Sequence, residues 1–356
     1  MARLVLISNA HVGPLYGVGA AVLFGLSPPL AKLLLPDIMP VMMVGLLYFG
    51  AGLGLLAFEV FVYRWLGRVR VETPIQPGDW PWLLGMIIFG GMLGPLLMLT
   101  GLSRLSAVLT SLLLNLEAPF TILIAIAFFR EHLSRWEGLG ALLIIIGGIV
   151  VSYQPDALRV EWLGVVAVMG ATLCWALDNN FTQRLSSLRD PIRITRIKAL
   201  VAGLGMITLA FLFGQPVPTA PVTTEVLMLG VVSYGISLLL DTYALRLLGA
   251  AREAAYFATA PFIGALAAVP ILGERWGIQD VLTAGFMAVG LAWLLTARHS
   301  HTHTHEEIEH EHLHRHEDHH LHEHESSKDS HAHPHRHHPV THVHAHVSEL
   351  HHRHPH

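Results

Sequence analysis

Apolar stretches alternate with short charged or Pro/Gly-rich segments along residues 15–296. A helix needs about 20 mostly apolar residues to cross a hydrocarbon layer of about 30 Å. The fourth and fifth stretches are the most clearly separated, because the polar segment REHLSRWEG divides them. The pattern predicts ten transmembrane helices, at residues 15–35, 40–63, 81–102, 106–129, 136–153, 161–183, 194–214, 225–245, 251–272 and 278–296.

The composition places the chain among integral membrane proteins. It is 53% hydrophobic and 13% charged, whereas soluble domains contain about 25% charged residues. The net charge of −4 comes without a broad basic face, so no nucleic-acid partner is expected. The chain also has neither a Gly-rich phosphate loop nor a nucleophile elbow. We therefore expect an all-α integral membrane protein that is not an enzyme and has no catalytic residues.

The basic residues indicate an orientation in the membrane. With the N-terminus inside, the cytoplasmic segments contain 14 Lys and Arg residues, Lys198 among them, against four in the outer segments. Positively charged loops stay in the cytoplasm. We expect a multi-pass protein of the cell inner (plasma) membrane, with the lipid bilayer as its partner and both termini cytoplasmic. The sequence leaves a homodimer open.

The chain repeats itself. LTGLSRLSAVLTSLLLNLEAPF (Leu99–Phe120) aligns without a gap with DTYALRLLGAAREAAYFATAPF (Asp241–Phe262). Because five helices per repeat is an odd number, the second repeat must enter the membrane from the opposite side, as in many secondary carriers. The alternative is a duplication without consequence for transport. The predicted domains are a short N-terminal segment (1–14), two inverted five-helix repeats (15–153 and 154–297) and a tail (298–356).

Two segments carry a family resemblance. NLEAPFTILIAIAFFREHLSRWEGLGALLIIIGGIVV from Asn115 and ATAPFIGALAAVPILGERWGIQDVLTAGFMAVGLAWLL from Ala258 resemble the EamA type of the drug/metabolite transporter (DMT) superfamily. The resemblance covers roughly residues 15–297. It implies a secondary carrier, commonly an exporter, without nucleotide-hydrolysing machinery. It implies no substrate, since the family handles amino acids, sugars, nucleotides, cations and drugs.

Polar side chains at membrane depth are the candidates for the transport path, because each costs about 2.5–3.5 kcal/mol on insertion. Asp178, Asn179 and Asn180 in CWALDNNFTQ are the first candidates for a proton or cation site. Alternatively, they cap or kink the sixth helix through local hydrogen bonds. Glu117 lies two residues before Pro119, which removes a backbone hydrogen bond and predicts an interrupted helix lining a cavity.

The remaining membrane-embedded acids have weaker claims. Asp241 and Tyr243 lie in the eighth helix, where Asp241 either contacts the substrate or pairs with Arg246. Glu59 and Lys32 lie near helix ends, from which long side chains reach the interface. The aligned pair Glu131 and Glu274 falls in loops and is interpreted as marking helix boundaries.

The tail differs from the rest of the chain in its chemistry. Residues 299–356 hold 24 of the 26 histidines and 10 of the 26 acidic residues, and Cys174 is the single cysteine, so metal ligands would be N and O atoms. Histidine-rich tracts bind Ni, Co, Zn or Cu(II), here through several exchanging sites in a disordered segment. A solubilising extension or a recombinant tag are the alternatives, although a run of six histidines is missing. The predicted metal ligands are His301, His303, His305, His310, His312, His314, His316, His319, His320, His322, His324, His331, His333, His335, His337, His338, His342, His344 and His346.

These patterns support a secondary-active exporter of a divalent transition metal, nickel or cobalt ahead of zinc, working by proton antiport. The tail would bind these metal ions at the cytoplasmic mouth, and the core would require no cofactor. The alternative is an EamA-like exporter of amino acids, drugs or other metabolites whose tail is a metal-responsive regulator. A third possibility is a metal store without transport.

Overall fold

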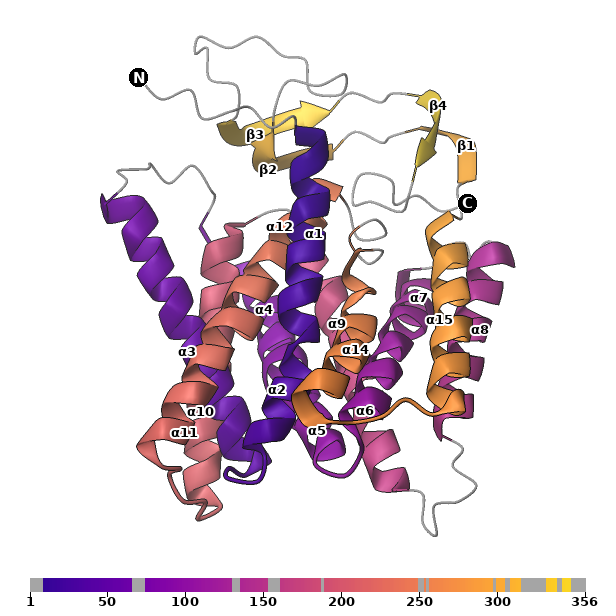
Figure 1. The fold of residues 1–356 in the computed structure, drawn as a ribbon. Coiled ribbons are helices and arrows are strands. Elements are labelled where there is room, and N and C mark those ends of the chain that lie inside the picture. Colours follow the sequence, from indigo (N-terminus) through magenta and orange to yellow (C-terminus); the bar gives the residue numbers. More distant parts are fainter. Residues whose placement is uncertain are drawn as a thin grey trace, which may run out of the picture.

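The computed structural model describes residues 9–65, 74–129, 135–152, 161–186, 189–248, 253, 256–296, 299–304, 308–314, 331–337 and 341–346. Its helices form one bundle with a common long direction (Figure 1). Helix α1 begins and helix α15 ends at the same end of this bundle (Figure 1).

In the first repeat the elements are α1 (Asn9–Gly25), α2 (Ser27–Leu34), α3 (Pro40–Val60), η1 (Phe61–Trp65), η2 (Pro77–Asp79), α4 (Trp80–Gly85), η3 (Met86–Leu93), α5 (Gly94–Leu102), α6 (Ala107–Leu113), η4 (Leu114–Leu116), α7 (Glu117–Phe129) and α8 (Arg135–Ser152). In the second repeat they are α9 (Trp162–Ser186), α10 (Pro191–Leu212), α11 (Ala220–Leu229), η5 (Gly230–Ile236), α12 (Ser237–Leu248), α14 (Ala260–Leu272) and α15 (Ile278–Thr296). The η elements are π-helices (η1, η3, η5) or 3-10 helices (η2, η4).

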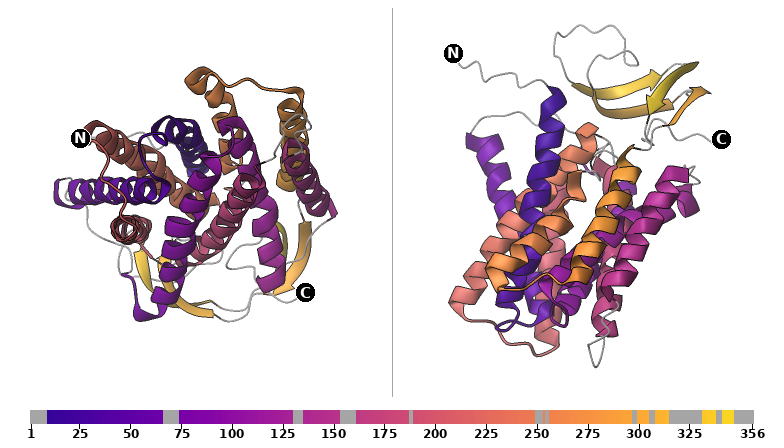
Figure 2. Two further views of the ribbon diagram at one scale, coloured as in Figure 1. Left: turned by 90° about the horizontal axis from the view of Figure 1, so that it is seen from below. Right: turned by 45° about the vertical axis from the view of Figure 1, so that its right-hand side comes forward.

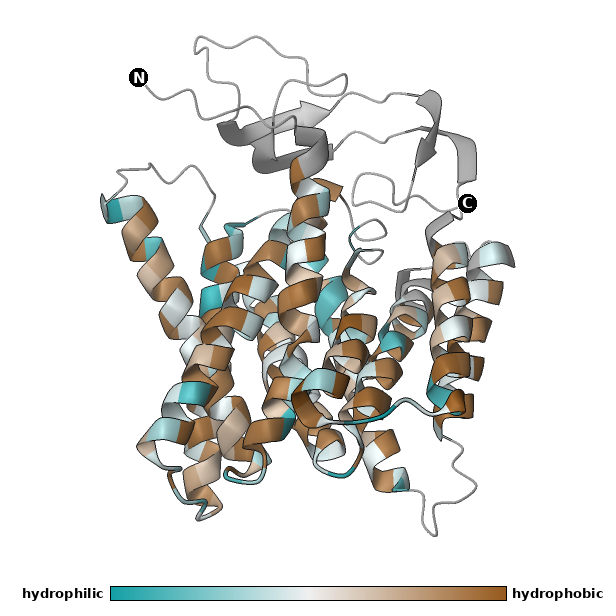
Figure 3. Cartoon of the chain, in the orientation of Figure 1, coloured by the Kyte–Doolittle hydropathy of each residue, from teal (hydrophilic) through white to brown (hydrophobic). Residues whose placement is uncertain are grey.

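The helices have the length and composition of a membrane domain. Among the described residues, six helical segments are long and apolar enough to cross a membrane, and four shorter apolar helices accompany them. Each of the ten predicted spans overlaps one of these segments. Large apolar side chains such as Leu212 (78% exposed) and Ile149 (64% exposed) point outward, and Figure 3 shows apolar residues along most of the helix length. The class of helical membrane protein is confirmed, while the number of crossings stays a prediction.

The most extensive helix contacts join the two repeats. Helix α3 packs on α10, α8 on α15, α5 on α9, α1 on α12 and α6 on α14. Figure 2 shows α8 and α15 side by side at one edge of the bundle. Together the helices enclose a core of buried apolar residues that includes Met43, Leu47, Met98 and Leu112.

Three helix irregularities lie inside apolar segments, at η3, η4 and η5. The fourth predicted helix is interrupted by the 3-10 turn η4 just before Glu117, as the Pro119 signal indicates. The π-helix η3 ends just before Pro95. In an α-helix the proline ring would clash with the carbonyl group one turn earlier, and the wider π-helix avoids this clash. Helix η5 repeats this irregularity in the second repeat. Such π-segments are frequent at functional sites.

The tail contains strands where we predicted disorder. Strand β1 (His299–Thr304) pairs antiparallel with β4 (Thr341–His346), and β2 (Ile308–His314) pairs antiparallel with β3 (His331–His337). The physical reason lies in the sequence, because histidines alternate there with Thr, Glu, Ala and Val, and a period of two is typical of strands. These strands lie beyond the end of the bundle at which α15 ends (Figure 1).

Candidate functional site

An ion pair lies inside the bundle between α9 and α10. The Nζ atom of Lys198 donates to Oδ2 of Asp178, and the two side chains are 6% and 7% exposed. The orientation count above assigns Lys198 to a cytoplasmic segment, whereas the structure buries it inside the bundle on α10. Lys198 lies about 10 Å along α10 from Pro191, because the polar start of that helix continues into the bundle to meet Asp178.

Glu117 connects the first repeat to the same place. Its Oε1 atom accepts a hydrogen bond of 2.5 Å from Nδ2 of Asn179. Asn180 instead donates to the carbonyl oxygen of Ala176 in its own helix, at 2.8 Å. The structure therefore brings Glu117, Asp178 and Asn179 together. Asn180 makes a local hydrogen bond within its own helix, which is the alternative given above for these polar residues.

Asp241 belongs to the same region through a residue that the sequence analysis missed. Its carboxyl group lies within electrostatic reach of Glu253, Lys198 and Asp178. The carboxyl groups of Asp241 and Glu253 are both buried. In the sequence, Glu253 follows Arg252 near the expected start of the ninth helix. A charged residue at such a position is usually solvated, so nothing local indicates that Glu253 is buried. Tyr243 lies against Tyr16 of α1, with ring centroids 6.1 Å apart.

We call Glu117, Asp178, Lys198, Asp241 and Glu253 the buried acidic cluster. It contains four carboxyl groups and one ammonium group, linked by contacts or electrostatic interactions. Full ionisation would leave three negative charges uncompensated in a site that water barely reaches. Since buried charges need partners, protons or a cation must neutralise the excess.

The cluster is not a preformed multidentate metal site. Within the described residues, no three His, Cys, Asp or Glu side chains lie close enough together to hold a metal ion. Two buried carboxylate oxygens, Oδ1 of Asp178 and Oε1 of Glu253, have no hydrogen-bond partner in the described part of the chain. These oxygens are where a proton, a water molecule or a cation would bind.

Helix η3 shapes the space around Asp178. A side chain at Gly90 would overlap the Asp178 carboxylate and would have to displace it. The Gly90 carbonyl oxygen accepts a 2.6 Å hydrogen bond from the Tyr48 hydroxyl. Aromatic rings lie beside this contact: Tyr48 is 5.4 Å from Tyr234, and Phe24 is 5.6 Å from Trp175.

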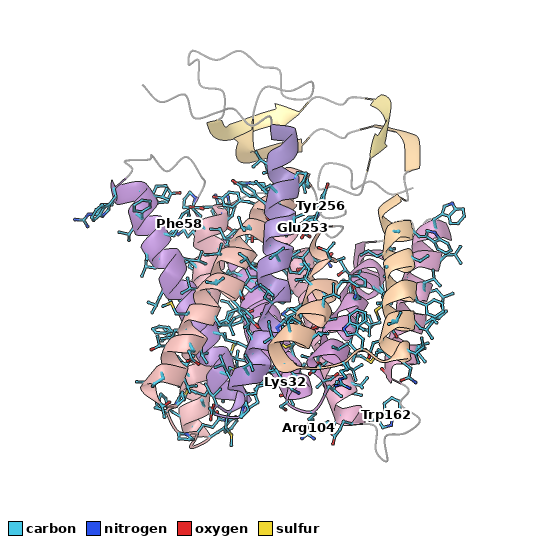
Figure 4. The ribbon with its side chains drawn as sticks, in the orientation of Figure 1. Lys32, Phe58, Arg104, Trp162, Glu253 and Tyr256 are labelled. Carbon is cyan, nitrogen blue, oxygen red and sulfur yellow. The ribbon has the colours of Figure 1, made fainter. Side chains whose placement is uncertain are left out.

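Further polar contacts hold the two ends of the bundle. At one end, the Nε atom of Arg189 donates to Oδ2 of Asp79 at 2.6 Å. At the opposite end, where Figure 4 labels Lys32 and Arg104, Lys32 donates to the carbonyl oxygens of Leu102 (2.6 Å) and Leu105. These contacts fix helix ends on either side of the buried acidic cluster.

Two expectations about helix-end charges need correction. Glu59 is buried and ion-paired with Arg196, so its carboxylate does not extend to the interface. Lys32 binds backbone carbonyl groups because the turn after α5 presents them unpaired. Glu274 does mark a helix boundary, that of α6, by accepting the N–H groups of Ala107 (2.8 Å) and Val108 (2.9 Å). Its aligned partner Glu131 lies outside the described residues.

The predicted metal ligands of the tail divide into two groups. Those in strands β1–β4 are His301, His303, His310, His312, His314, His331, His333, His335, His337, His342, His344 and His346. Those outside the described residues are His305, His316, His319, His320, His322, His324 and His338.

The apolar helices and the buried polar centre define a multi-pass helical membrane protein. The chain belongs to the EamA-like transporter family, whose model matches twice, over residues 11–153 and 162–296. It is 32% identical over 305 residues to an uncharacterized transporter of Methanothermobacter thermautotrophicus, covering 80% of this chain and 87% of that one. It is 24% identical over 217 residues to an uncharacterized transporter of Archaeoglobus fulgidus, covering 60% and 76% of the two chains.

A solved crystal structure has the same fold. The TM-score is 0.59 at 18% identity, and the superposition covers 79% of this chain and 95% of the other. At this identity the likeness concerns the fold alone.

Proposed function

We propose that the protein is a secondary-active exporter of a small cation, a divalent transition metal with nickel or cobalt ahead of zinc, that works by proton antiport. The observation that carries the proposal is the buried acidic cluster, in which four carboxyl groups share one ammonium group. Such a site gains by binding a cation and repels anions. Its charge balance also allows protons to replace the cation.

Lys198 would act as the internal cation of the unloaded site. It neutralises Asp178 while no substrate is bound, which avoids the cost of a lone buried carboxylate. An arriving cation would compete with Lys198 for Asp178, and the Oδ1 atom of Asp178 is free to bind it first. Glu117 and Asn179 lie next to Asp178 as further oxygen ligands.

Alternating access would come from the inverted repeat. The helix contacts support an exchange symmetry between the two repeats. The contact of α1 with α12 has its counterpart in the contact of α9 with α5. The contacts of α3 with α10 and of α8 with α15 each join equivalent helices of the two repeats. A twofold relation in the membrane plane requires such a pattern. The buried acidic cluster takes Glu117 from the first repeat and the other four residues from the second, so movement of one repeat against the other would change access to it.

The tail would supply the metal. Neutral imidazole binds nickel, cobalt and zinc, and a chelating segment attached to the carrier raises the metal concentration at the mouth of the path. Helix α15 ends at the same end of the bundle as Glu253 and Tyr256, as Figure 4 shows. Under the predicted orientation, this end lies in the cytoplasm of a cell with the protein in its inner membrane.

One observation favours a second candidate. The described carboxylates do not converge as a group of three, while the Tyr48 hydroxyl contacts Gly90 and Trp175 precedes Asp178 by about one turn of α9. Aromatic rings next to a carboxylate suit an organic cation through cation–π interactions. In this alternative the core exports an organic solute and the tail is a metal-responsive regulator.

Cellular metal content tests the proposal. Nickel, cobalt and zinc would be measured by elemental mass spectrometry in four strains: without the protein, with the full protein, with a chain ending at Arg298, and with Asp178→Asn. We expect lower metal with the full protein, partial restoration with the truncation, and full restoration with Asp178→Asn. If metal content stays unchanged, or rises in proportion to the tail, the core does not export metal.

A further inference from the structure

Histidines of the tail lie opposite one another in both of its strand pairs. The register of β1 with β4 and that of β2 with β3 each match histidine with histidine at every second position. We call each such opposed pair of histidines a rung. The rungs are His299 and His346, His301 and His344, and His303 and His342 in the first strand pair, and His310 and His335, His312 and His333, and His314 and His331 in the second.

Each strand pair has its histidines on one face. Successive residues of a strand belong to opposite faces, so residues at every second position share a face. The other face of β1 and β4 is made by Ser300, Thr302, Thr304, Thr341, Val343 and Ala345. The other face of β2 and β3 is made by Glu309, Glu311, Leu313, Ala332, Pro334 and Arg336. Each strand pair therefore has one face with three rungs and a second face without histidine.

The residues of the second face fit the same register. Glu309 lies opposite Arg336, and Leu313 lies opposite Ala332. Opposite charges and apolar residues that face each other across two strands stabilise the pairing. A slip by one residue would set each histidine opposite a residue of another type and would exchange the two faces. The alternation that forms the strands thus also pairs the histidines.

We propose that each rung binds one divalent transition-metal ion through its two imidazoles, so that the tail carries two short rows of metal sites. This assigns the tail histidines to defined pairs, in place of independent and exchangeable single ligands. Delivery of the bound ions to the carrier rests on the proposed function. The binding of metal by rungs does not.

The spacing of opposed residues suits a site with two imidazole ligands. Directly opposite residues of antiparallel strands have Cβ atoms about 4.5–5.5 Å apart. Two nitrogen atoms that bind one ion at about 2.0–2.1 Å each are at most about 4 Å apart. Successive rungs are about 6.5–7 Å apart along a strand. Histidines of one rung are therefore closer to each other than to those of the next rung.

Two protein ligands for each ion define the kind of binding. Within the part of the chain that the structure describes, no group of three metal-binding side chains occurs, so water would complete the coordination. Neutral imidazole suits nickel, cobalt, zinc and Cu(II), whereas magnesium and calcium prefer oxygen ligands. Such a site binds more weakly than a structural zinc site with four protein ligands. Weak binding allows each ion to be released again.

Two variants that remove equal numbers of histidines test the rungs. The β1–β2 variant removes one histidine from every rung, and the β1–β4 variant removes both histidines from three rungs. The first carries His299→Ala, His301→Ala, His303→Ala, His310→Ala, His312→Ala and His314→Ala. The second carries His299→Ala, His301→Ala, His303→Ala, His342→Ala, His344→Ala and His346→Ala.

Nickel bound to the purified full-length protein would be counted at neutral pH, by equilibrium dialysis and elemental mass spectrometry. Because one missing histidine disables a rung, the β1–β2 variant should lose about twice as many nickel ions as the β1–β4 variant. Thr302→Ala, on the face of β1 without histidine, should lose none. Equal losses in the two variants would show that the histidines bind independently, and no loss in either would show that they are not ligands. Both results overturn the inference.

Export from cells then tests delivery separately. At limiting nickel, the β1–β2 variant should export nickel at least about twofold more slowly than the β1–β4 variant, and the difference should vanish at saturating nickel. Equal rates at limiting nickel would contradict delivery by the rungs. If the full protein lowers none of the cellular nickel, cobalt or zinc, the proposed export is wrong, whereas the nickel count on the purified protein still decides whether the rungs bind metal.

Discussion

Asp178 of α9 and Lys198 of α10 are bound to each other in the interior of the bundle, about two helical turns from the nearest helix ends. Solvent reaches little of either side chain. Each charged group is therefore neutralised by the other and not by water. The pair also lies against Gly90 of η3, whose missing side chain leaves room for the carboxylate. A site that must exchange one cation for another can be built from such a pair.

Removing one member of this pair should destabilise the protein more than removing both. Asp178→Asn or Lys198→Met leaves a buried charge without its partner, at a cost of about 3–5 kcal/mol. The double variant leaves two neutral side chains and should recover most of that stability. Thermal unfolding in detergent would measure the three variants, and the double variant should still be inactive in transport. Equal, additive losses would show that the two groups do not interact.

Gly90→Ala should disturb the site through its shape. The new methyl group would overlap the Asp178 carboxylate, and overpacking costs about 1–3 kcal/mol. We expect a matching loss of thermal stability and a transport rate reduced at least as far. Gly285→Ala in α15 is the matched control, since nothing lies near an added side chain there, and it should stay within about 0.5 kcal/mol of wild type. Equal behaviour of the two variants would contradict the close approach of η3 and α9.

Glu274 should contribute to stability as the cap of a helix in the other repeat. It accepts the first two N–H groups of α6, which have no partner within the helix. Glu274→Ala should cost about 1–3 kcal/mol, and Glu274→Gln, which keeps one acceptor oxygen, should cost less. Thermal unfolding would measure both, with the exposed neighbour Arg275→Gln as a control. An unchanged melting temperature for Glu274→Ala would exclude the capping role.

Metal binding by the tail should weaken as the pH falls. An imidazole binds metal when neutral, and its ordinary pKa is about 6.5, so protons displace nickel increasingly below that pH. Isothermal titration calorimetry of nickel on the full-length protein should show this loss on acidification. The chain ending at Arg298 should lack the acid-sensitive sites. Binding that persists well below about pH 6 would mean that the tail carboxylates, and not its histidines, hold the metal.

The helical membrane class could be predicted because it depends on long apolar stretches, which are local in the sequence. The interruption before Glu117 was also predictable, since Pro119 removes a backbone donor at a fixed position. The strands of the tail were not predicted, because a histidine-rich composition is typical of disordered metal-binding segments. The alternation of histidine with other residues, which has the period of two of a β-strand, favours the opposite conclusion. That alternation is present in segments such as HSHTHT (residues 299–304).

The buried acidic cluster could be predicted only in part. Asp178, Asn179, Glu117 and Asp241 are conspicuous as polar residues within apolar stretches. Lys198 and Glu253 are not conspicuous in the sequence. Each lies near other charged residues at an expected helix end, where a charged side chain is usually solvated. Their partners lie on other helices, so the depth of these two residues depends on helix packing that no local pattern contains.

The central claim is that the buried acidic cluster moves a divalent cation in exchange for protons. Purified protein in proteoliposomes, acidic on the inside, should accumulate nickel or cobalt, measured by elemental mass spectrometry, and should do so while the internal pH rises. Asp178→Asn should abolish both changes, and Glu225→Gln, which removes an exposed acid on α11, should abolish neither. Uptake that is absent for nickel, cobalt and zinc in wild type, or that proceeds equally without a pH gradient, would contradict the claim.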